Sequence, residues 1–563
     1  MAEHAAAAAL DAGVAGLAAA YGLGLDPVTV VEEVLARLDA SDDPAVWIDV
    51  EPADALLLAA KELTATPPEA RGPLWGVPFA VKDNIDVAGR VTTAGLPGAA
   101  YPAEATAIAV ERLLAAGALY VGKTNLDQLA TGLVGTRSPY GTPRNPFDPT
   151  LAPGGSSSGS AVAVATRQVA FALGTDTAGS GRVPAALCGI VGVKGAPGAV
   201  PTDGVVPASP TIDCVSTFAR SVADGLLVES AMAATPWPVA QGPFRAAVAD
   251  GVSMERVALA AAGHEVLTVD LAPFHEAGDL LYGGPWLADR TAALRSTLAA
   301  VPEGLVDVVR TVVAGGEAYT GTEVFGAVER LAALRRSLAA WWDDVDVLVV
   351  PTVPAVPSLA EVAADPIGVN ARLGRNTTFA NLLGLCAITV PAADGPGGVT
   401  VLAPAAGAGA VAAIAGALRG EALEPGPLGA GGRVHLAVVG AHLRGQPLNH
   451  QLVDRGGVLV ATAATAPCYR LYHLRGGPPE RPALERVGLS GRAIEVEVWS
   501  LDAAAFGEVV ALVAPPLGIG SVELDGGRWV KGFICETHGL ADATDITANG
   551  SWRRYLRGRG GDV

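Results

Sequence analysis

The feature that most limits the possible folds is an alternation of two patterns between about residue 25 and about residue 420. Stretches with apolar residues at i, i+3 and i+4 and charges on the opposite side, such as 105–116 and 324–342, are typical of helices packed on a sheet. Between them lie short β-branched runs bounded by turn residues, the pattern of strands buried on both faces. These runs include Val77–Val81, Leu119–Val121, Val345–Val350 and Ala387–Val390. The alternation predicts an α/β layered domain.

The pattern changes at residues 423–432, LEPGPLGAGG, which hold two prolines and four glycines. We therefore predict a first domain over residues 1–424, a linker over 425–432 and a second domain over 433–563. The second segment has strands with little helix, which predicts a small α+β domain. The expected strands are Val434–Val439, Val458–Ala463, Ala493–Trp499 and Ser521–Cys535, the last with a hairpin turn at Asp525-Gly526-Gly527.

Charge and cysteine content exclude several functional classes. The chain has 57 acidic and 38 basic residues and a net charge of -19, which argues against a nucleic-acid partner. The densest basic run, 553–559, is interpreted as a C-terminal tail. The five cysteines are far apart and form no CxxC, so we expect reduced cysteines rather than a disulfide framework or a zinc site.

Two apolar segments bear on localisation. Residues 1–20 are Ala-rich but contain Glu3 and Asp11 and no basic region, which favours an N-terminal helix over a signal peptide. Residues 395–418 carry no charge, but Pro396 and Pro404 interrupt them, so a buried strand, loop and helix is favoured over a membrane span. We expect a soluble, cytoplasmic protein with no membrane partner.

The segment Pro153–Arg182, PGGSSSGSAVAVATRQVAFALGTDTAGSGR, is rich in small residues at both ends, with a predicted apolar helix over Ala161–Val169 between them. Small residues permit the close backbone approach that an anion or oxyanion site needs. A Gly-rich loop before a helix can also hold phosphate, but no GxxxxGK[ST] and no GxGxxG after a strand is present. By itself such a segment is more often a plain loop than the carrier of a nucleophile.

Four further motifs accompany this segment: Gly76–Asp86 (GVPFAVKDNID), Gly122–Leu129 (GKTNLDQL), Val349–Pro354 (VVPTVP) and Phe379–Pro391 (FANLLGLCAITVP). Together they resemble the amidase signature family, in that family's order and at its spacings, from about residue 70 to about residue 395. The resemblance implies a central mixed, twisted sheet covered by helices. It also implies amide hydrolysis.

The same resemblance implies a Ser–cisSer–Lys triad. Lys82 matches the base, Ser156 the bridging serine that follows a cis peptide bond, and Ser180, 24 positions later, the nucleophile. A serine hydroxyl needs a base to take its proton, and a lysine is a base only when burial keeps it neutral. The apolar residues before Lys82 are consistent with such burial.

The backbone N–H groups of Thr177, Ala178, Gly179 and Ser180 are implied to form the oxyanion hole. Some positions depart from the family pattern: Ser158 and Ser160 lie where smaller residues are common, Ala178 replaces a frequent glycine, and Val193-Lys194-Gly195-Ala196 lacks the usual KPT. None of these departures falls on a triad residue.

Within the family, the chain resembles the allophanate hydrolase branch. Asp127–Pro139 and Gly179–Ala185 are similar to that branch's motifs, and the branch carries a C-terminal extension of this size. Tyr282 and Arg290 match its substrate segment, where a guanidinium fits the carboxylate of allophanate. The implied role of the extension is to promote decarboxylation of the product, and His442, in VVGAHLRGQPLN, is the candidate residue.

This branch implies a small-molecule substrate, allophanate, with no metal and no organic cofactor. We also expect a homodimer and a functional link to a biotin-dependent urea carboxylase. One alternative is another amidase-signature enzyme, for instance the amidase component of a tRNA-dependent amidotransferase. The other is a non-catalytic amidase-like scaffold, which is disfavoured because Lys82, Ser156 and Ser180 are all present.

Overall fold

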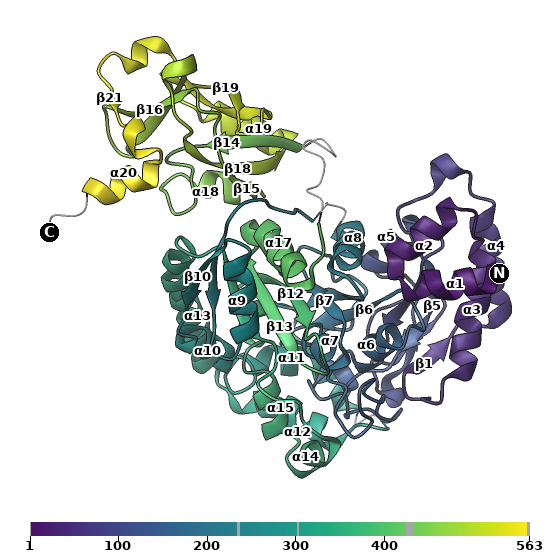
Figure 1. Cartoon of the computed structure of the whole chain (residues 1–563). Coiled ribbons are helices and arrows are strands. Elements are labelled where there is room, and N and C mark those ends of the chain that lie inside the picture. Colours follow the sequence, from purple (N-terminus) through teal and green to yellow (C-terminus); the bar gives the residue numbers. More distant parts are fainter. Residues whose placement is uncertain (1, 234–236, 301–302, 424–432, 560–563) are drawn as a thin grey trace.

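The protein is described by a computed structural model that covers residues 2–233, 237–300, 303–423 and 433–559 (Figure 1). The predicted linker, 425–432, lies outside the described residues. The predicted division into two domains therefore remains a prediction, although the sheets on either side of the linker are separate.

The main part of the chain is built around a mixed sheet of eleven strands in the described residues. Strands β5, β2 and β6 are parallel neighbours, the strands from β6 to β11 alternate in direction, and β11, β9 and β10 are again parallel. This confirms the predicted mixed sheet. The strand order is β1 (Trp47–Val50), β5 (Leu119–Thr124), β2 (Pro78–Lys82), β6 (Phe171–Asp176), β8 (Cys214–Ala219), β7 (Val191–Lys194), β12 (Leu385–Pro391), β13 (Gly398–Pro404), β11 (Val347–Pro351), β9 (Arg245–Val248) and β10 (Glu265–Thr268).

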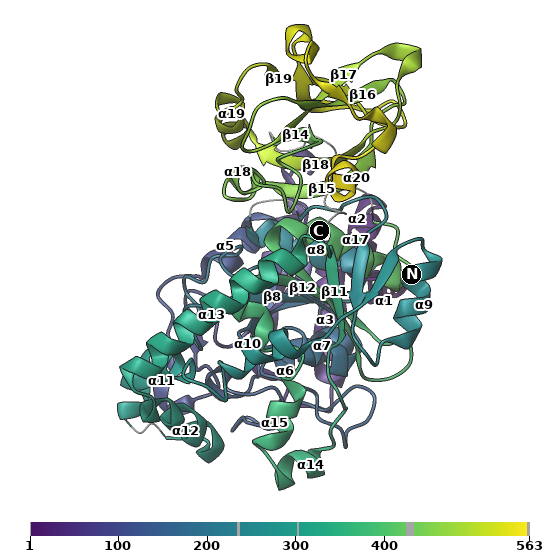
Figure 2. The same cartoon turned by 90° about the vertical axis from the view of Figure 1, so that its left-hand side faces the viewer.

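Helices cover this sheet (Figures 1 and 2). At the β1 end lie α1 (Ala2–Asp11), α2 (Gly13–Gly22), α3 (Pro27–Ala40) and α4 (Ala53–Thr64). At the β10 end lie α9 (Ser253–Ala261), α10 (Ala272–Asp279) and α13 (Gly321–Trp342). The others are α5 (Ile108–Ala115), α6 (Ser158–Ala165), α7 (Val183–Cys188), α8 (Val222–Ala233), α11 (Leu287–Ala299), α12 (Asp307–Ala314), α14 (Leu359–Ala364), α15 (Gly368–Leu373), α16 (Phe379–Leu382) and α17 (Ala408–Arg419).

The predicted helices 105–116 and 324–342 appear as α5 and α13 with ends shifted by up to three residues. Two other predicted helices differ for identifiable reasons. The N-terminal helix is broken into α1 and α2, because Gly13 adopts a φ of +84° and the buried Asp224 carboxylate accepts the N–H groups of the next two residues. Helix α6 begins at Ser158 instead of Ala161 and ends at Ala165, because Arg167 adopts a left-handed φ of +62°. The uncharged segment 395–418 forms strand β13 and helix α17, as predicted. Within the described residues no helix combines the length and apolar character that a bilayer span requires.

The C-terminal part is an α+β unit, as predicted, with a five-stranded and a three-stranded sheet among its described residues. The first has the order β15 (Val458–Ala464), β18 (Glu495–Asp502), β14 (Arg433–Val438), β20 (Trp529–Cys535) and β19 (Leu517–Glu523), and the second has β17 (Arg481–Arg486), β16 (Tyr469–Leu474) and β21 (Thr544–Asp545). The helices are α18 (His450–Val453), α19 (Ala503–Ala511) and α20 (Trp552–Arg559).

The interpretation of residues 553–559 as a tail is wrong. They belong to α20, and Arg553 is anchored by Glu495 and by the buried Glu497, with the shorter N–O distance at 2.7 Å. The predicted hairpin is present, since β19 and β20 are antiparallel neighbours on either side of Asp525-Gly526-Gly527.

The two parts of the chain touch along β15, the edge strand of the five-stranded sheet (Figure 2). The N–H of Gln241 donates to Val460 O at 3.2 Å, and the N–H of Thr462 donates to Gln241 O at 3.3 Å. Arg444 also pairs with the buried Asp346. Main-chain hydrogen bonds therefore hold the C-terminal part against the segment before β9, and an ion pair holds it against the residue before β11.

Candidate active site

Lys82 lies at the carboxyl end of β2, next to the carboxyl end of the parallel strand β6. Its Nζ donates to Ser156 Oγ at 2.7 Å and to Thr175 Oγ1 at 2.8 Å. Thr175 also accepts a hydrogen bond from Asn84 Nδ2 at 3.2 Å. All four side chains are buried. The predicted contact between Lys82 and Ser156 is therefore present, and Thr175 is an additional partner that the sequence analysis did not identify.

Burial lowers the pKa of Lys82 to about 7, against the opposing effect of the Asp127, Asp176 and Asp213 carboxylates, and the nearby Arg290 guanidinium lowers it further. A lysine with such a pKa is neutral in a large fraction of molecules near neutral pH, and the neutral amine can accept a proton. This environment suits Lys82 to the role of a general base.

Ser156 follows a cis peptide bond, Gly155–Ser156. The loop is fixed by its backbone: Ser156 O accepts the Asp127 N–H at 2.9 Å, and the Gly155 N–H donates to Leu133 O at 2.9 Å. A Cβ atom at Gly155 would lie 2.1 Å from Asp127 Oδ2, so this position has no room for a side chain. The geometry matches the bridging serine that the family resemblance implies.

Ser180 lies in the turn between β6 and α7, and its Oγ donates to Gly132 O at 3.4 Å. Among the described residues it forms no hydrogen bond to Ser156. The two serines nevertheless lie against the same short segment, because Leu133, the residue after Gly132, accepts the Gly155 N–H. Catalytic hydrogen bonds are often long or misaligned in a free enzyme and tighten when substrate binds. The loops of the two serines thus both contact residues 132–133, and the Ser180 hydroxyl points toward Gly132 O.

The expected oxyanion hole differs from the structure at one position. The Gly179 N–H donates to Asp176 Oδ1 at 3.0 Å and is therefore not free for a substrate oxygen. In the described part of the chain, the N–H groups of Thr177, Ala178 and Ser180 donate to no protein acceptor. Gly179 adopts a φ of +133°, and a Cβ there would lie 2.3 Å from Thr377 Oγ1. Glycine is needed at this position for the conformation of the turn.

A buried ion pair that the sequence analysis missed holds this turn. Arg182 Nε and Nη2 donate to the two oxygens of Asp176, each at 2.9 Å, and the Gly181 N–H donates to the same carboxylate at 3.0 Å. Although burial raises the pKa of Asp176, the Arg182 charge outweighs it and leaves the pKa below its usual value. The only signal in the sequence is an aspartate and an arginine on either side of the nucleophile motif.

Tyr282 and Arg290 lie together, as the sequence analysis expected. Arg290 is buried, and its Nη2 donates to Tyr282 Oη at 3.0 Å. Its Nη1 donates to Thr131 Oγ1 at 2.6 Å and, more weakly, to the carbonyls of Leu129 and Ala130, both in left-handed conformations. Thr131 precedes Gly132, whose carbonyl accepts the Ser180 hydroxyl. The Arg290 guanidinium therefore contacts the residue that precedes Gly132, the hydrogen-bond partner of the proposed nucleophile.

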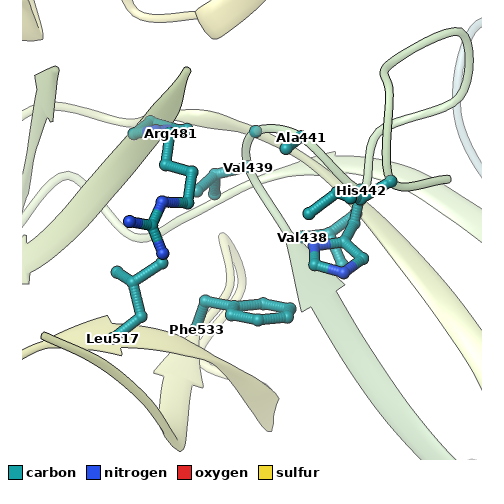
Figure 3. A pocket seen from close by; sticks show the side chains of 10 residues that line it. Val438, Val439, Ala441, His442, Arg481, Leu517 and Phe533 are labelled. Atoms are coloured by element: carbon teal, nitrogen blue, oxygen red, sulfur yellow. The ribbon is translucent and has the colours of Figure 1, made fainter. Parts of the chain in front are cut away.

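His442 is not brought to the triad, because it belongs to the C-terminal part. It lines a small pocket (Figure 3), where its ring stacks on Phe533 with centroids 4.8 Å apart and its Nε2 lies 3.0 Å from Gln451 Oε1. Burial lowers its pKa. No cluster of three or more potential metal-ligating side chains occurs in the described residues.

Two family models match the chain. The Amidase model matches residues 29–244 and 238–408, and the model described as "Allophanate hydrolase C-terminal domain" matches residues 434–557. These two matches cover most of both parts of the structure.

Among curated proteins, the urea amidolyase of Saccharomyces cerevisiae is 37% identical over 590 residues, which are 94% of this chain and 32% of that protein. This chain thus spans about a third of the length of the urea amidolyases it matches. Among solved structures, the allophanate hydrolase of Kluyveromyces lactis is 36% identical with a TM-score of 0.70, covering 96% of this chain and 98% of that one. Amidase 1 of Oryza sativa is 32% identical over 372 residues, which are 58% of this chain and 85% of that protein.

Proposed function

The chain belongs to the amidase family, and we propose that within this family it is an allophanate hydrolase. The observation that carries the choice of substrate is the Tyr282–Arg290 pair, which is linked through Thr131 and Gly132 to Ser180. Allophanate joins a carboxylate to a terminal amide through one ureido nitrogen. A guanidinium near the nucleophile can bind that carboxylate and leave the amide carbonyl at Ser180. The match to the Kluyveromyces lactis allophanate hydrolase over both parts of the chain supports this proposal.

The mechanism begins with attack by Ser180 Oγ on the terminal ureido carbonyl. Its proton passes to Ser156 Oγ as the Ser156 proton passes to neutral Lys82 Nζ, 2.7 Å away. The N–H groups of Thr177, Ala178 and Ser180 face the developing oxyanion. Protonated Lys82 returns the proton through Ser156 to the leaving nitrogen, and ammonia departs. Water then attacks the acyl-enzyme by the same route and releases an N-carboxylated carbamate.

We propose that residues 433–563 form a second domain that promotes decarboxylation of this product near His442. The pocket beside His442 and the match to an allophanate hydrolase C-terminal domain support this role. The match to about a third of each urea amidolyase supports a functional link to a urea-carboxylating activity. The cytoplasmic location and homodimer expected from the sequence remain proposals.

The substrate assignment is tested with Arg290→Gln. We expect kcat/KM for allophanate to fall about 30- to 4,000-fold, because the substrate carboxylate would lose its buried charged partner. This corresponds to a loss of transition-state stabilisation on the order of 2–5 kcal/mol. Ammonia release from an uncharged amide of similar size should fall much less. The measurement is initial-rate ammonia release from both substrates.

The control is Arg330→Gln, which removes an exposed arginine on α13 that pairs with Glu276. It should leave both rates unchanged. Equal losses for the charged and the neutral amide in Arg290→Gln would contradict carboxylate recognition and assign Arg290 a purely structural role.

The role of the second domain is tested with His442→Ala. Ammonia release in the first step should stay near that of the unchanged protein, because His442 lies outside the Ser180 site, while carbon dioxide should appear with a lag. The two products are timed separately in one reaction, since spontaneous decarboxylation also contributes. An absence of any lag would show that His442 does not assist the second step.

A further inference from the structure

We propose that residues 208–213, the connecting loop, fix the distance between the oxyanion hole and Arg290 and thereby select substrates by length. In this arrangement Asp213 and Asp289 are positioning residues, one for each of the two groups. The selection by length rests on the proposed function, because allophanate is the ligand that spans both groups, whereas the link between Asp213 and the oxyanion hole does not.

One set of contacts joins the connecting loop to the oxyanion hole. Thr177 Oγ1 donates to Asp213 Oδ1 at 2.5 Å, and both side chains are buried. The other carboxylate oxygen, Asp213 Oδ2, accepts the N–H groups of Ala208 and Ser209 at 2.8 and 3.0 Å. Because its side chain is held in this way, Thr177 keeps its N–H, which has no protein acceptor in the described residues, in a fixed direction. Asp213 is therefore suited to orient one donor of the oxyanion hole.

A second set of contacts joins the same loop to the helix that carries Arg290. Asp289 lies in the first turn of α11, directly before Arg290. Its Oδ2 accepts the hydroxyl of Ser209 at 2.6 Å and that of Thr211 at 2.9 Å. Thr211 Oγ1 in turn accepts a hydrogen bond from Trp286 Nε1 at 3.2 Å. Three hydrogen bonds thus fasten the start of α11 to the connecting loop.

The connecting loop is also braced internally. The N–H groups of Ile212 and Asp213 both donate to Ser209 O at 3.0 Å. Asn381 Nδ2 donates to Ile212 O at 2.9 Å and to Asp176 O, at the start of the turn that forms the oxyanion hole, at 2.7 Å. Buried polar networks whose members are all satisfied rigidify the segments they join. The loop and the turn therefore form one hydrogen-bonded unit.

A fixed separation of the two groups selects substrates by length. In allophanate one nitrogen lies between the carbonyl carbon that Ser180 attacks and the carboxylate carbon that Arg290 binds. One additional CH₂ would displace one of these ends by about 1 Å, and a misplacement of that size costs about 100-fold in rate. Because Asp213 and Asp289 join both groups to one loop, the loop sets the accepted length together with Arg290.

Selection by length is tested with Asp289→Ala, which removes the acceptor of the Ser209 and Thr211 hydroxyls. The substrates are allophanate and hydantoate, which has the same terminal ureido group and one more CH₂ before its carboxylate. We expect kcat/KM for allophanate to fall at least tenfold, chiefly through KM, and the preference for allophanate over hydantoate to narrow at least fivefold. Asp289→Asn, which keeps an acceptor oxygen, should recover most of both. Where hydantoate turnover is too slow to measure, its inhibition constant against allophanate gives the corresponding affinity ratio.

The matched control is Asp307→Ala, which removes an exposed aspartate in the first turn of α12, 3.8 Å from Arg310. It should leave the rates and the preference unchanged. A preference for allophanate over hydantoate that is the same in Asp289→Ala as in the unchanged protein would overturn the selection by length.

The link to the oxyanion hole is tested with Thr177→Val, which keeps the shape of the side chain but removes the hydroxyl that contacts Asp213. Because the oxyanion forms only in the transition state, kcat should fall at least tenfold with KM nearly unchanged, for charged and uncharged amides alike. Thr177→Ser, which restores the hydroxyl, should recover most of kcat. An equal kcat in Thr177→Val and in the unchanged protein would overturn the role of Asp213.

A failure of the proposed function would give a different result. If the unchanged protein released no ammonia from allophanate, the proposed function would fail, and the selection by length would fail with it. The Thr177 variants would then be measured with the amide that the protein cleaves fastest. Their kcat would still decide whether Asp213 orients the oxyanion hole.

Discussion

Ser180→Ala is expected to release ammonia from allophanate on the order of 10⁴- to 10⁶-fold more slowly than the unchanged protein, because triad residues act as one unit and removing one disables the whole. The fold should be intact, since Ser180 Oγ makes only one long hydrogen bond, to Gly132 O at 3.4 Å. The measurement is initial-rate ammonia release beside thermal unfolding of both proteins.

The matched control is Ser158→Ala, at the start of α6 and two residues after the bridging serine. Ser158 Oγ is buried without a hydrogen-bond partner in the described part of the chain, so its removal leaves no new unpaired group and should not reduce stability. Its activity should stay near that of the unchanged protein. Comparable activity in Ser180→Ala would mean that another residue is the nucleophile.

Lys82→Met should lose activity on the same scale, because no other side chain contacts Ser156 Oγ as a base in the described residues. In the unchanged protein, kcat/KM should rise about tenfold per pH unit below about 7 and level off above it, because only the neutral amine accepts a proton and burial lowers the pKa of Lys82 to about 7. The pH–rate profile of ammonia release measures this directly.

Lys82→Arg is the companion variant. It keeps a cation of similar reach but cannot become neutral, so it should be as inactive as Lys82→Met. Substantial activity in Lys82→Arg, or a profile that falls between about pH 5 and about pH 8, would contradict the role of Lys82 as a neutral base.

Much of the site could be predicted because its chemistry lies in short motifs. Lys82 and Ser156 meet as expected, and Tyr282 and Arg290, eight positions apart, are joined by a hydrogen bond. Thr175 was not foreseen, because its contact with Lys82 depends on the pairing of β2 with β6, which are 93 positions apart at that contact. The direction of the Gly179 N–H could not be predicted from the sequence either. It depends on the φ of Gly179 itself and on the position of the Asp176 carboxylate.

The fold followed the apolar pattern where strands are buried on both faces and departed from it where distant residues intervene. The Asp224 carboxylate divides the N-terminal helix from 210 positions away. Strands β16 and β17 were not anticipated, because Tyr469–Leu474 and Arg481–Arg486 contain charged and half-buried residues rather than a continuous apolar run. The helix over 553–559 was not predicted, because its run of arginines resembles a solvated tail. Arg553 is in fact paired with two glutamates.

The proposed substrate is tested by initial-rate ammonia release by the purified protein from allophanate beside urea, biuret, malonamate and glutamine. We expect kcat/KM for allophanate to exceed each of the others by at least about 100-fold, because only allophanate places a carboxylate at Arg290 and a ureido carbonyl at Ser180 together. Faster ammonia release from glutamine, or none from allophanate, would contradict it.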